Sequence, residues 1–287
     1  MGAGLGTGGD EMFEEMLTQA TDAELTAAVS ANLYTLFRAM VVLPGYEPVE
    51  HAGLSGHSTP LSNPMFRGVW AARLQSSQVE TAIDAAIAWF GQRRTQDFLW
   101  WIDGQTEPYD LAARLLARGF DGNLDGDPGM ALDLDSLRQS RPEGLTVMRA
   151  STERQLQDWQ DVFTLAFAEP SATGQAWVNA TVQAGGTAAP WRLYVGYLGG
   201  RPVATSLVFP GAGVVGVYAV GTLPEVRRKG IGASITAASL LEAQAYGYRY
   251  AVLFATRSGQ SVYQRVGFRA VVGAVGVYLY EPPGGQS

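Results

Sequence analysis

Three basic residues and two glycines stand close together between an apolar run and a helical pattern. They are Arg227, Arg228, Lys229, Gly230 and Gly232. The first N–H groups of a helix have no carbonyl partner and carry a partial positive charge, so an anion can bind there. Glycine has no Cβ atom, so phosphate oxygens can approach its backbone closely. The segment is therefore typical of a loop that holds a pyrophosphate.

The residues on either side of this loop predict the elements that must position it. Residues 214–220 are an apolar run rich in β-formers, and apolar residues recur at intervals of three and four after the loop. Gly247 stands where a glycine commonly ends a helix. The predicted order is a strand, a phosphate loop and a helix over 232–246.

Three nucleotide-binding motifs could be meant by this pattern. A P-loop needs Lys-Ser/Thr after its second glycine, and a dinucleotide fingerprint needs G-x-G-x-x-G after a strand, but neither spacing is present. The spacing that fits is Arg-x-x-Gly-x-Gly, formed by Arg227, Gly230 and Gly232, with Pro224 three residues before the arginine. It resembles the acyl-CoA loop of the GNAT superfamily of N-acetyltransferases.

A second motif follows at the spacing that the resemblance requires. Residues 248–255 predict a strand and 256–259 a turn, and a short helix over 259–266 then ends in Gly267-Phe268. Family members carry Tyr-x-x-x-Gly-Phe at this place, and Tyr263 matches its tyrosine. Two motifs in the right order identify the segment as similar to a GNAT domain.

The resemblance covers about residues 145–281. Residues 145–150 resemble the opening strand of the family and residues 158–167 its first helix. Thr222 stands where a valine is common, and Thr256 stands where an asparagine is frequent. The second departure leaves the side-chain contacts at that turn open.

The resemblance implies acetyl-CoA as cosubstrate, no metal, and transfer of the acetyl group to a primary amine by direct attack in a ternary complex. It implies that a backbone N–H near Val220 polarises the thioester oxygen and that Tyr263 gives a proton to the departing thiolate. The cofactor-binding residues that it implies are Val220, Gly221, Thr222, Arg227, Arg228, Lys229, Gly230, Ile231, Gly232, Ala233 and Ser258.

Several assignments stay open at this stage. Glu169, just beyond the predicted first helix of the domain, is a candidate general base, but it could equally be a surface glutamate before Pro170, with a water chain taking the proton. Tyr263 alone could be a packing tyrosine. The acceptor could be a small-molecule or a peptide amine, and the donor could be a longer acyl-CoA. The alternative function is a non-catalytic acyl-CoA-binding sensor or accessory protein.

A second copy of the same unit is predicted in the first half of the chain. Residues 79–90, 98–102, 109–118 and 130–134 predict helix, strand, helix and strand, and Gly119-Phe120 precedes Gly267-Phe268 by 148 residues. At 74–78 this copy reads Leu-Gln-Ser-Ser-Gln, without glycine or cation. We therefore expect it to be degenerate and to bind no acyl-CoA.

The fold class predicted from these patterns is α/β (α+β), with two tandem GNAT-like domains. Each would have a mixed, mainly antiparallel central sheet flanked by helices. The predicted division is a flexible N-terminus over 1–20, a degenerate GNAT-like domain over 21–140 and a catalytic GNAT domain over 145–283. A polar linker over 137–144 separates the copies.

Composition narrows the class of protein. The 287 residues are 47% hydrophobic and include no cysteine, which excludes disulfides and a thiol nucleophile. The net charge of −7 argues against nucleic acid as a partner. The sequence has no continuous apolar run near the ~18 residues that span a bilayer and no signal-peptide pattern. We therefore expect a cytoplasmic protein without a membrane partner. A homodimer is possible.

The remaining N-terminal region predicts structure rather than chemistry. A helix is predicted from Asp22 to about Met40, capped by Thr21 or by Asp22 itself, and residues 44–64 are predicted to be a loop. The two histidines, His51 and His57, have no third ligand at metal-binding spacing except Glu50. We expect no metal site.

Overall fold

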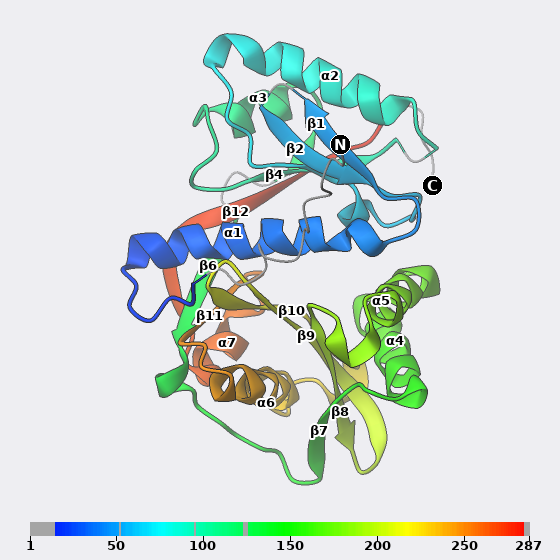
Figure 1. The fold of residues 1–287 in the computed structure, drawn as a ribbon, viewed down its shortest axis with the longest axis vertical. Helices are drawn as coiled ribbons and strands as arrows, with labels where there is room; N and C mark the ends of the chain where they lie inside the picture. The colour runs from blue at the N-terminus through cyan, green and yellow to red at the C-terminus, as the bar shows by residue number, and fades with distance from the viewer. Residues whose placement is uncertain (1–14, 52, 95, 123–125, 284–287) are drawn as a thin grey trace, which may run out of the picture.

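The computed structural model of the protein describes residues 15–51, 53–94, 96–122 and 126–283. Its strands form one large sheet that is mostly antiparallel and is flanked by helices, so the predicted mixed α/β fold is confirmed. In Figure 1 one helix, α1 (Asp22–Ala39), crosses the middle of the molecule between an upper and a lower half. The upper half comes mainly from the first part of the chain.

The first part of the chain supplies most of the upper half, and its last strand lies in the lower half. Its helices and strands are α1 (Asp22–Ala39), β1 (Glu47–His51), β2 (Leu54–Ser58), β3 (Gly68–Trp70), α2 (Val79–Gly91), β4 (Phe98–Ile102), α3 (Leu111–Ala117), β5 (Asp121–Gly122) and β6 (Asp127–Asp133). Short 3₁₀ turns connect them at η1 (Met40–Val42), η2 (Pro64–Phe66), η3 (Ser76–Gln78) and η4 (Leu134–Ser136).

The second part supplies most of the lower half. Its elements are β7 (Leu145–Arg149), α4 (Glu153–Phe167), α5 (Ser171–Gln183), η5 (Gly186–Ala188), β8 (Arg192–Leu198), β9 (Arg201–Gly211), β10 (Val214–Thr222), η6 (Pro224–Val226), α6 (Ile231–Ala245), β11 (Tyr250–Phe254), α7 (Gln260–Val266) and β12 (Arg269–Tyr280).

Each half contains one strand–helix–strand unit whose strands are parallel. In the first half α2 connects β3 to the parallel strand β4, and in the second half α6 connects β10 to the parallel strand β11. The other strand pairs within the sheet are antiparallel. The two helices α2 and α6 therefore occupy equivalent positions.

The strands that end the two halves cross between them. The sheet order is β1-β2-β3-β4-β12-β6-β11-β10-β9-β8-β7, so β6 pairs with β11 of the second half. The long strand β12 pairs first with β6 and then, over 276–280, with β4. The predicted units 21–140 and 145–283 thus share strands across the linker, and their exact division stays a prediction.

Helix α1 packs at the centre of this arrangement. Thr21 and Glu24 form a capping box at its start, as the sequence pattern predicts. By length and composition alone, the stretch 22–42 could cross a membrane, but 56% of it is buried inside the fold. It lies against β6, β9, β10, β11 and β12, so its apolar residues serve the shared core.

Two regions near the N-terminus differ from the sequence-based expectation. The prediction of a loop over 44–64 is wrong, because β1 and β2 form a hairpin there with Gly53 at φ +87° between them. The flexible N-terminus was predicted over 1–20, and residues 1–14 lie outside the described residues. Leu17 N donates to Gly213 O at 3.0 Å and Ala20 N to the Tyr250 hydroxyl at 3.2 Å, so residues 15–20 contact the second half.

Candidate functional site

The N-terminus of α6 is open. Gly230 is its N-cap with φ +79°, a left-handed conformation that favours glycine. Ser234 N donates to Gly230 O at 3.0 Å, so the N–H groups of Ile231, Gly232 and Ala233 precede this first turn-closing bond. No side chain caps the helix and no acidic residue lies in its first turn. These N–H groups are arranged to bind an anion.

Gly232 has no steric reason to be a glycine. A Cβ atom built there would lie 3.5 Å from Val262 Cγ1 and 3.7 Å from Thr222 Oγ1, which are ordinary contacts, and its φ is not positive. Glycine inside a helix costs about 1 kcal/mol relative to alanine. The packing within the described structure therefore does not require a glycine at this position.

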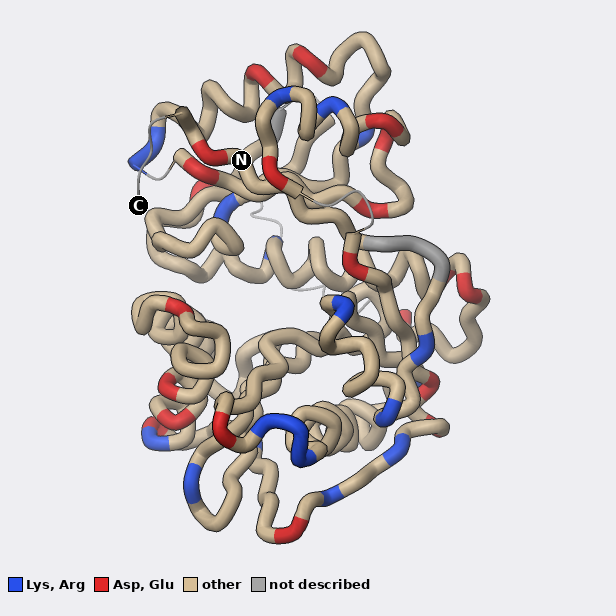
Figure 2. Tube along the Cα trace, turned by 180° about the vertical axis from the view of Figure 1, so that it is seen from behind, with Lys and Arg blue, Asp and Glu red and all other residues tan. Residues whose placement is uncertain are grey.

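The three basic residues beside this helix play different parts. Arg227 donates from Nε to Thr222 O and from Nη2 to Ala166 O, both at 2.9 Å, so its guanidinium ties the loop to β10 and α4. Arg228 and Lys229 are exposed and have no hydrogen bond or ion pair within the described parts of the chain. The three form a continuous basic stretch in Figure 2. Two of them are thus free to meet a phosphate.

Arg228 also has an unusual backbone. Its φ is +62°, which is uncommon for a residue with a side chain. Together with Gly230 it turns the chain sharply just before α6. Turns that contain left-handed residues can direct backbone N–H groups toward an anion.

Strand β10 bulges near its end. Tyr218 pairs with Leu207 and Gly221 with Thr205, so one extra residue lies in β10 between these pairs. Ala219 has φ +49°, and its carbonyl accepts a hydrogen bond from Thr205 Oγ1 at 3.0 Å. The bulge takes Ala219 and Val220 out of the β9 register and changes the direction of their backbone groups.

The same end of β10 also separates from its other neighbour. β10 and β11 pair only at Val215–Ala251 and Gly216–Val252, although β10 continues to Thr222 and β11 to Phe254. The two strands therefore splay apart toward the loop. Such a splay leaves unpaired backbone groups on both sides, which an extended ligand could pair with.

Tyr263 lies on α7, close to these features. Val220, Val262 and Tyr263 pack against one hydrophobic cluster, and Val262 faces Gly232 at the start of α6. The ring of Tyr263 meets that of Phe268 edge-on at 6.0 Å between centroids. Burial raises the pKa of Tyr263 to about 12, so its hydroxyl stays protonated at neutral pH. The tyrosine and the loop are thus brought to one end of α6.

The turn before α7 holds Ser258. Its side chain is exposed, and its hydroxyl lies 3.2 Å from Thr256 Oγ1. Thr256 O accepts from Gly259 N at 2.8 Å, which closes the turn. Thr256 therefore holds the turn through its backbone, while both hydroxyls lie at the surface.

Glu169 lies at the contact between the two halves. Its Oε2 accepts hydrogen bonds from Asn63 Nδ2 at 2.6 Å and from Thr173 Oγ1 at 3.3 Å. Phe167, two residues earlier, packs at Gly221 beside the bulge. The structure thus places the predicted base near the splayed strand, with one of its oxygens already engaged by Asn63.

Sequence reasoning missed three contributors to this region. Ala219 carries the positive φ of the bulge, Thr205 holds its carbonyl, and Asn63 binds Glu169 from the other half. Nothing local distinguishes an alanine that will bulge or an asparagine that will meet a residue 106 positions away. Only the Asn-Pro pair at 63–64 carried a signal, as the start of the 3₁₀ turn η2.

Of the two histidines, the structure describes the side chain of His57. His57 is buried among the rings of Phe37, Tyr46 and Trp70. Nothing is described of the His51 side chain. Among the described residues there is no group of three or more His, Asp or Glu side chains that could hold a metal ion.

Comparisons with known proteins agree with this geometry. Residues 147–271 match the family model described as an acetyltransferase (GNAT) domain. No curated protein matches the chain.

Solved structures share the fold over nearly the whole chain. A GCN5-related N-acetyltransferase from Kribbella flavida has a TM-score of 0.68 and 20% identity, covering 88% of this chain and 96% of its own. A GCN5-related N-acetyltransferase from Sphaerobacter thermophilus has a TM-score of 0.60 and 16% identity, covering 95% and 96%. A tandem GNAT protein from the clavulanic acid biosynthesis pathway has a TM-score of 0.55 and 15% identity, covering 93% and 96%.

At these identities the solved structures establish the fold, and the family model locates the domain within it. The match begins inside β7 and ends inside β12, so it includes the bulged strand, the open helix and α7. Residues 147–271 of this chain are therefore similar to a GNAT acetyltransferase domain.

Proposed function

We propose that this protein is an N-acetyltransferase that moves the acetyl group of acetyl-CoA to a primary amine in a ternary complex. The second half would bind one acetyl-CoA, and the first half would be a degenerate copy without that capacity. The observation that carries the proposal is the open N-terminus of α6, with Gly230, Gly232 and two unpaired cations, beside the bulged end of β10.

The loop would hold the pyrophosphate of the cosubstrate. The N–H groups of Ile231, Gly232 and Ala233 would donate to phosphate oxygens, while Arg228 and Lys229 balance their charge. Arg227 would keep the loop in place through its bonds to Thr222 and Ala166.

The splayed strands would hold the rest of the cosubstrate. The pantetheine arm would pair with the backbone around Val220, Gly221 and Thr222, where β10 has left β11. The N–H of Val220, turned by the bulge, would then donate to the thioester oxygen as it gains negative charge. Ser258, in the turn between β11 and α7, would contact the cofactor from the β11 side of the gap between the two strands.

The transfer itself forms one bond and breaks one. The amine nitrogen attacks the thioester carbon with its lone pair, and the carbon–sulfur bond then breaks with its electron pair going to sulfur. The amine loses one proton, to the free Oε1 of Glu169 or to water, and the thiolate gains one. The products are the acetylated amine and coenzyme A.

Tyr263 would act on the sulfur. A thiol titrates near ~8.5, and burial raises the pKa of Tyr263 to about 12, so complete transfer of its proton to a finished thiolate is unfavourable. A hydrogen bond from the tyrosine to the sulfur while charge develops avoids that cost. We therefore assign Tyr263 as a hydrogen-bond donor that stabilises the leaving group and keeps its own proton, while the proton that the thiolate gains is the one lost by the amine, relayed by Glu169 or water.

A binding protein without turnover is the alternative. The hydrogen bonds of Asn63 and Thr173 to Glu169 Oε2 favour it, because they hold this carboxylate in a structural contact and leave only Oε1 to take a proton from the amine. Such a protein would bind acyl-CoA through the same loop but release no coenzyme A.

One experiment separates these possibilities. Titration calorimetry with acetyl-CoA should give about one site per chain, and a panel of polyamines, aminoglycosides, amino acids and peptides should then be screened for thiol release. Binding with release on one amine class supports the enzyme, and binding without release on any class supports the sensor. Two sites per chain would contradict the degenerate first copy, and no binding would overturn both functions.

A further inference from the structure

A cavity of about 370 Å³ lies at the other end of α6 from the phosphate loop. Its walls come from β8, β9 and β10, from the last turn of α6, and from Met16 near the N-terminus. Helix α6 has 15 residues, and at 1.5 Å per residue its two ends are about 20 Å apart. The cavity is therefore separate from the site proposed for acetyl-CoA, and its volume is within the range of small-molecule sites.

One side of the cavity is apolar and aromatic. Val208, Pro210 and Val215 form the floor on the sheet, and Tyr246 and Tyr248 stand beside it. The Tyr246 side chain is 62% exposed, which is high for an aromatic residue that packs in a core. This wall can accommodate an apolar body about the size of one ring.

The opposite side carries Arg192 and Glu242, and Glu242 also pairs with Arg149, which does not line the cavity. Glu242 Oε1 lies 2.7 Å from Arg149 Nη1 and 3.7 Å from Arg192 Nε, and Glu242 Oε2 accepts from the Tyr194 hydroxyl. Two guanidinium groups therefore share one carboxylate, leaving a net charge of +1. Both carboxylate oxygens already have partners and the net charge is positive, so this side disfavours a cationic ligand.

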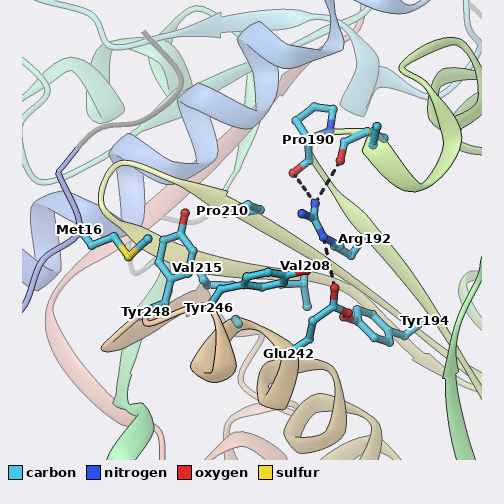
Figure 3. A pocket seen from close by; sticks show the side chains of 13 residues that line it. Met16, Pro190, Arg192, Tyr194, Val208, Pro210, Val215, Glu242, Tyr246 and Tyr248 are labelled. Carbon is cyan, nitrogen blue, oxygen red and sulfur yellow. Dashed lines mark hydrogen bonds and ion pairs between the residues drawn. The ribbon is translucent and has the colours of Figure 1, made fainter. Parts of the chain in front are cut away.

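Two donors at the cavity are free. Arg192 uses Nη1 for Ala189 O and Pro190 O, while its Nη2 has no bond to any described residue. The Tyr248 hydroxyl likewise has no hydrogen-bond partner within the described chain, and burial raises its pKa, so it stays a donor at neutral pH. In Figure 3 the Arg192 guanidinium and the two tyrosine rings border the same space.

We propose that this cavity binds a small carboxylate with an apolar, ring-sized body. The carboxylate would pair with Arg192 Nη2, and the body would lie on Tyr246, Tyr248 and the apolar floor of the sheet. A neutral ligand of the same shape would leave the excess positive charge unpaired, and a cation would be repelled by it.

The experiment uses 3-phenylpropionate as the probe, with 3-phenylpropionamide and 3-phenylpropylamine as its neutral and cationic counterparts. Calorimetry and ligand-observed NMR on the full chain should show the carboxylate binding about tenfold or more tightly than either counterpart. Arg192→Gln and Tyr246→Ala should each weaken it by about five- to tenfold. Arg201→Gln, which removes an exposed arginine paired with Glu225, should leave it unchanged.

Two further variants make the outcome decisive. Tyr246 is exposed, so its removal tests the cavity even if Arg192→Gln disturbs the fold around Glu242. Gly232→Val should not alter binding of the carboxylate in the cavity, because Gly232 lies at the other end of α6. A probe that bound instead at the start of α6 would lose its binding in this variant, so the result distinguishes the two sites. No binding up to about 10 mM, equal binding of all three probes, or binding unaffected by both cavity variants would overturn the proposal.

Discussion

Helices α2 and α6 both connect two parallel strands, yet they begin in opposite ways. Before α2, Gln75 N donates to Gln78 Oε1 at 3.0 Å in the capping box of the turn η3, although no side chain caps α2 itself, and Glu80 lies in the first turn of the helix. Before α6, Gly230 offers no side-chain cap, and the first turn has no acidic residue. The two starts therefore differ in charge, because α2 has an acidic residue in its first turn and α6 has none.

The two strand–helix–strand units therefore differ in what meets the charge at the start of their helix. The partial positive charge of a helix N-terminus must be met by something. At α2 it is met by Glu80, whose carboxylate also pairs with Arg118 at 2.8 Å. At α6 the neighbouring charges are positive, so only an anion from outside can meet it. The same fold element is thus closed in one half and available to a ligand in the other.

The largest expected effect comes from Tyr263→Phe. It keeps the ring that packs on Phe268 but removes the hydroxyl, so turnover should fall by about 10²–10⁴, or roughly 3–5 kcal/mol, with acetyl-CoA affinity little changed. Steady-state kinetics on the best acceptor and calorimetry check this. The control is Tyr280→Phe, which changes a tyrosine at the end of β12 whose ring lies beside Phe98. This variant should retain turnover. Parental turnover of the Tyr263 variant would remove it from the mechanism.

A second test adds a side chain at the open helix start. Gly232→Val should weaken acetyl-CoA binding by about 100-fold or more, because its branched side chain would meet the pyrophosphate. Gly232→Ala should weaken binding less while raising stability by up to about 1 kcal/mol, since alanine favours a helix. Calorimetry and urea unfolding measure the two effects.

The control for these variants is Gly91→Val at the end of α2, where a Cβ would meet nothing within 4 Å. It should leave acetyl-CoA binding unchanged. A folded Gly232→Val protein with parental affinity would show that phosphate does not bind at α6.

A third test concerns His57, which is buried on β2 in the upper half of the molecule. Burial lowers the pKa of His57 to about 3, so the folded protein keeps it neutral while the unfolded chain protonates it below about 6.5. Stability should be unaffected by His57 above that pH and should fall by ~1.4 kcal/mol per unit below it, or about 2–3 kcal/mol by pH 4.5.

The matched variant is His57→Phe, which keeps a ring between Tyr46 and Trp70 and removes the titration. Urea unfolding at a series of pH values should show a flatter acid limb for this variant. The same slope in both proteins would assign the acid sensitivity to other groups.

The smallest effect is expected where α2 is closed. Gln78→Ala removes one half of the capping box and should cost about 0.5–1 kcal/mol of stability, while acetyl-CoA binding stays unchanged. Thermal unfolding and calorimetry measure both. A loss of acetyl-CoA affinity in this variant would indicate that the first half takes part in binding.

The order of elements around the phosphate loop was predictable from the sequence because it depends on local residues. Gly230 adopts φ +79° just before α6, as a glycine between a strand pattern and a helical pattern suggests, and the helix begins at Ile231 against a predicted 232. Strand β4 has its predicted bounds, 98–102. Turn residues, caps and apolar periodicity act within a few positions, so a single sequence contains them.

Pairing between distant segments was decided only by the tertiary structure. The crossing of β6 and β12 between the halves depends on which strand edges are free when the sheet assembles, and neither strand carries a local signal for it. The hairpin of β1 and β2 also depends on pairing. Its two segments contain Gly, Ser and Pro, and they become strands only by pairing with each other and with β3.

The site shows the same division. Arg227, Gly230, Gly232 and Tyr263 could be named from their spacing, since each belongs to a short motif on one element. The bulge at Ala219 and the contact of Asn63 with Glu169 could not, because backbone strain and contacts between halves exist only once the whole sheet holds them in place. The sequence alone therefore determined where a phosphate could bind, and the tertiary structure decided what surrounds it.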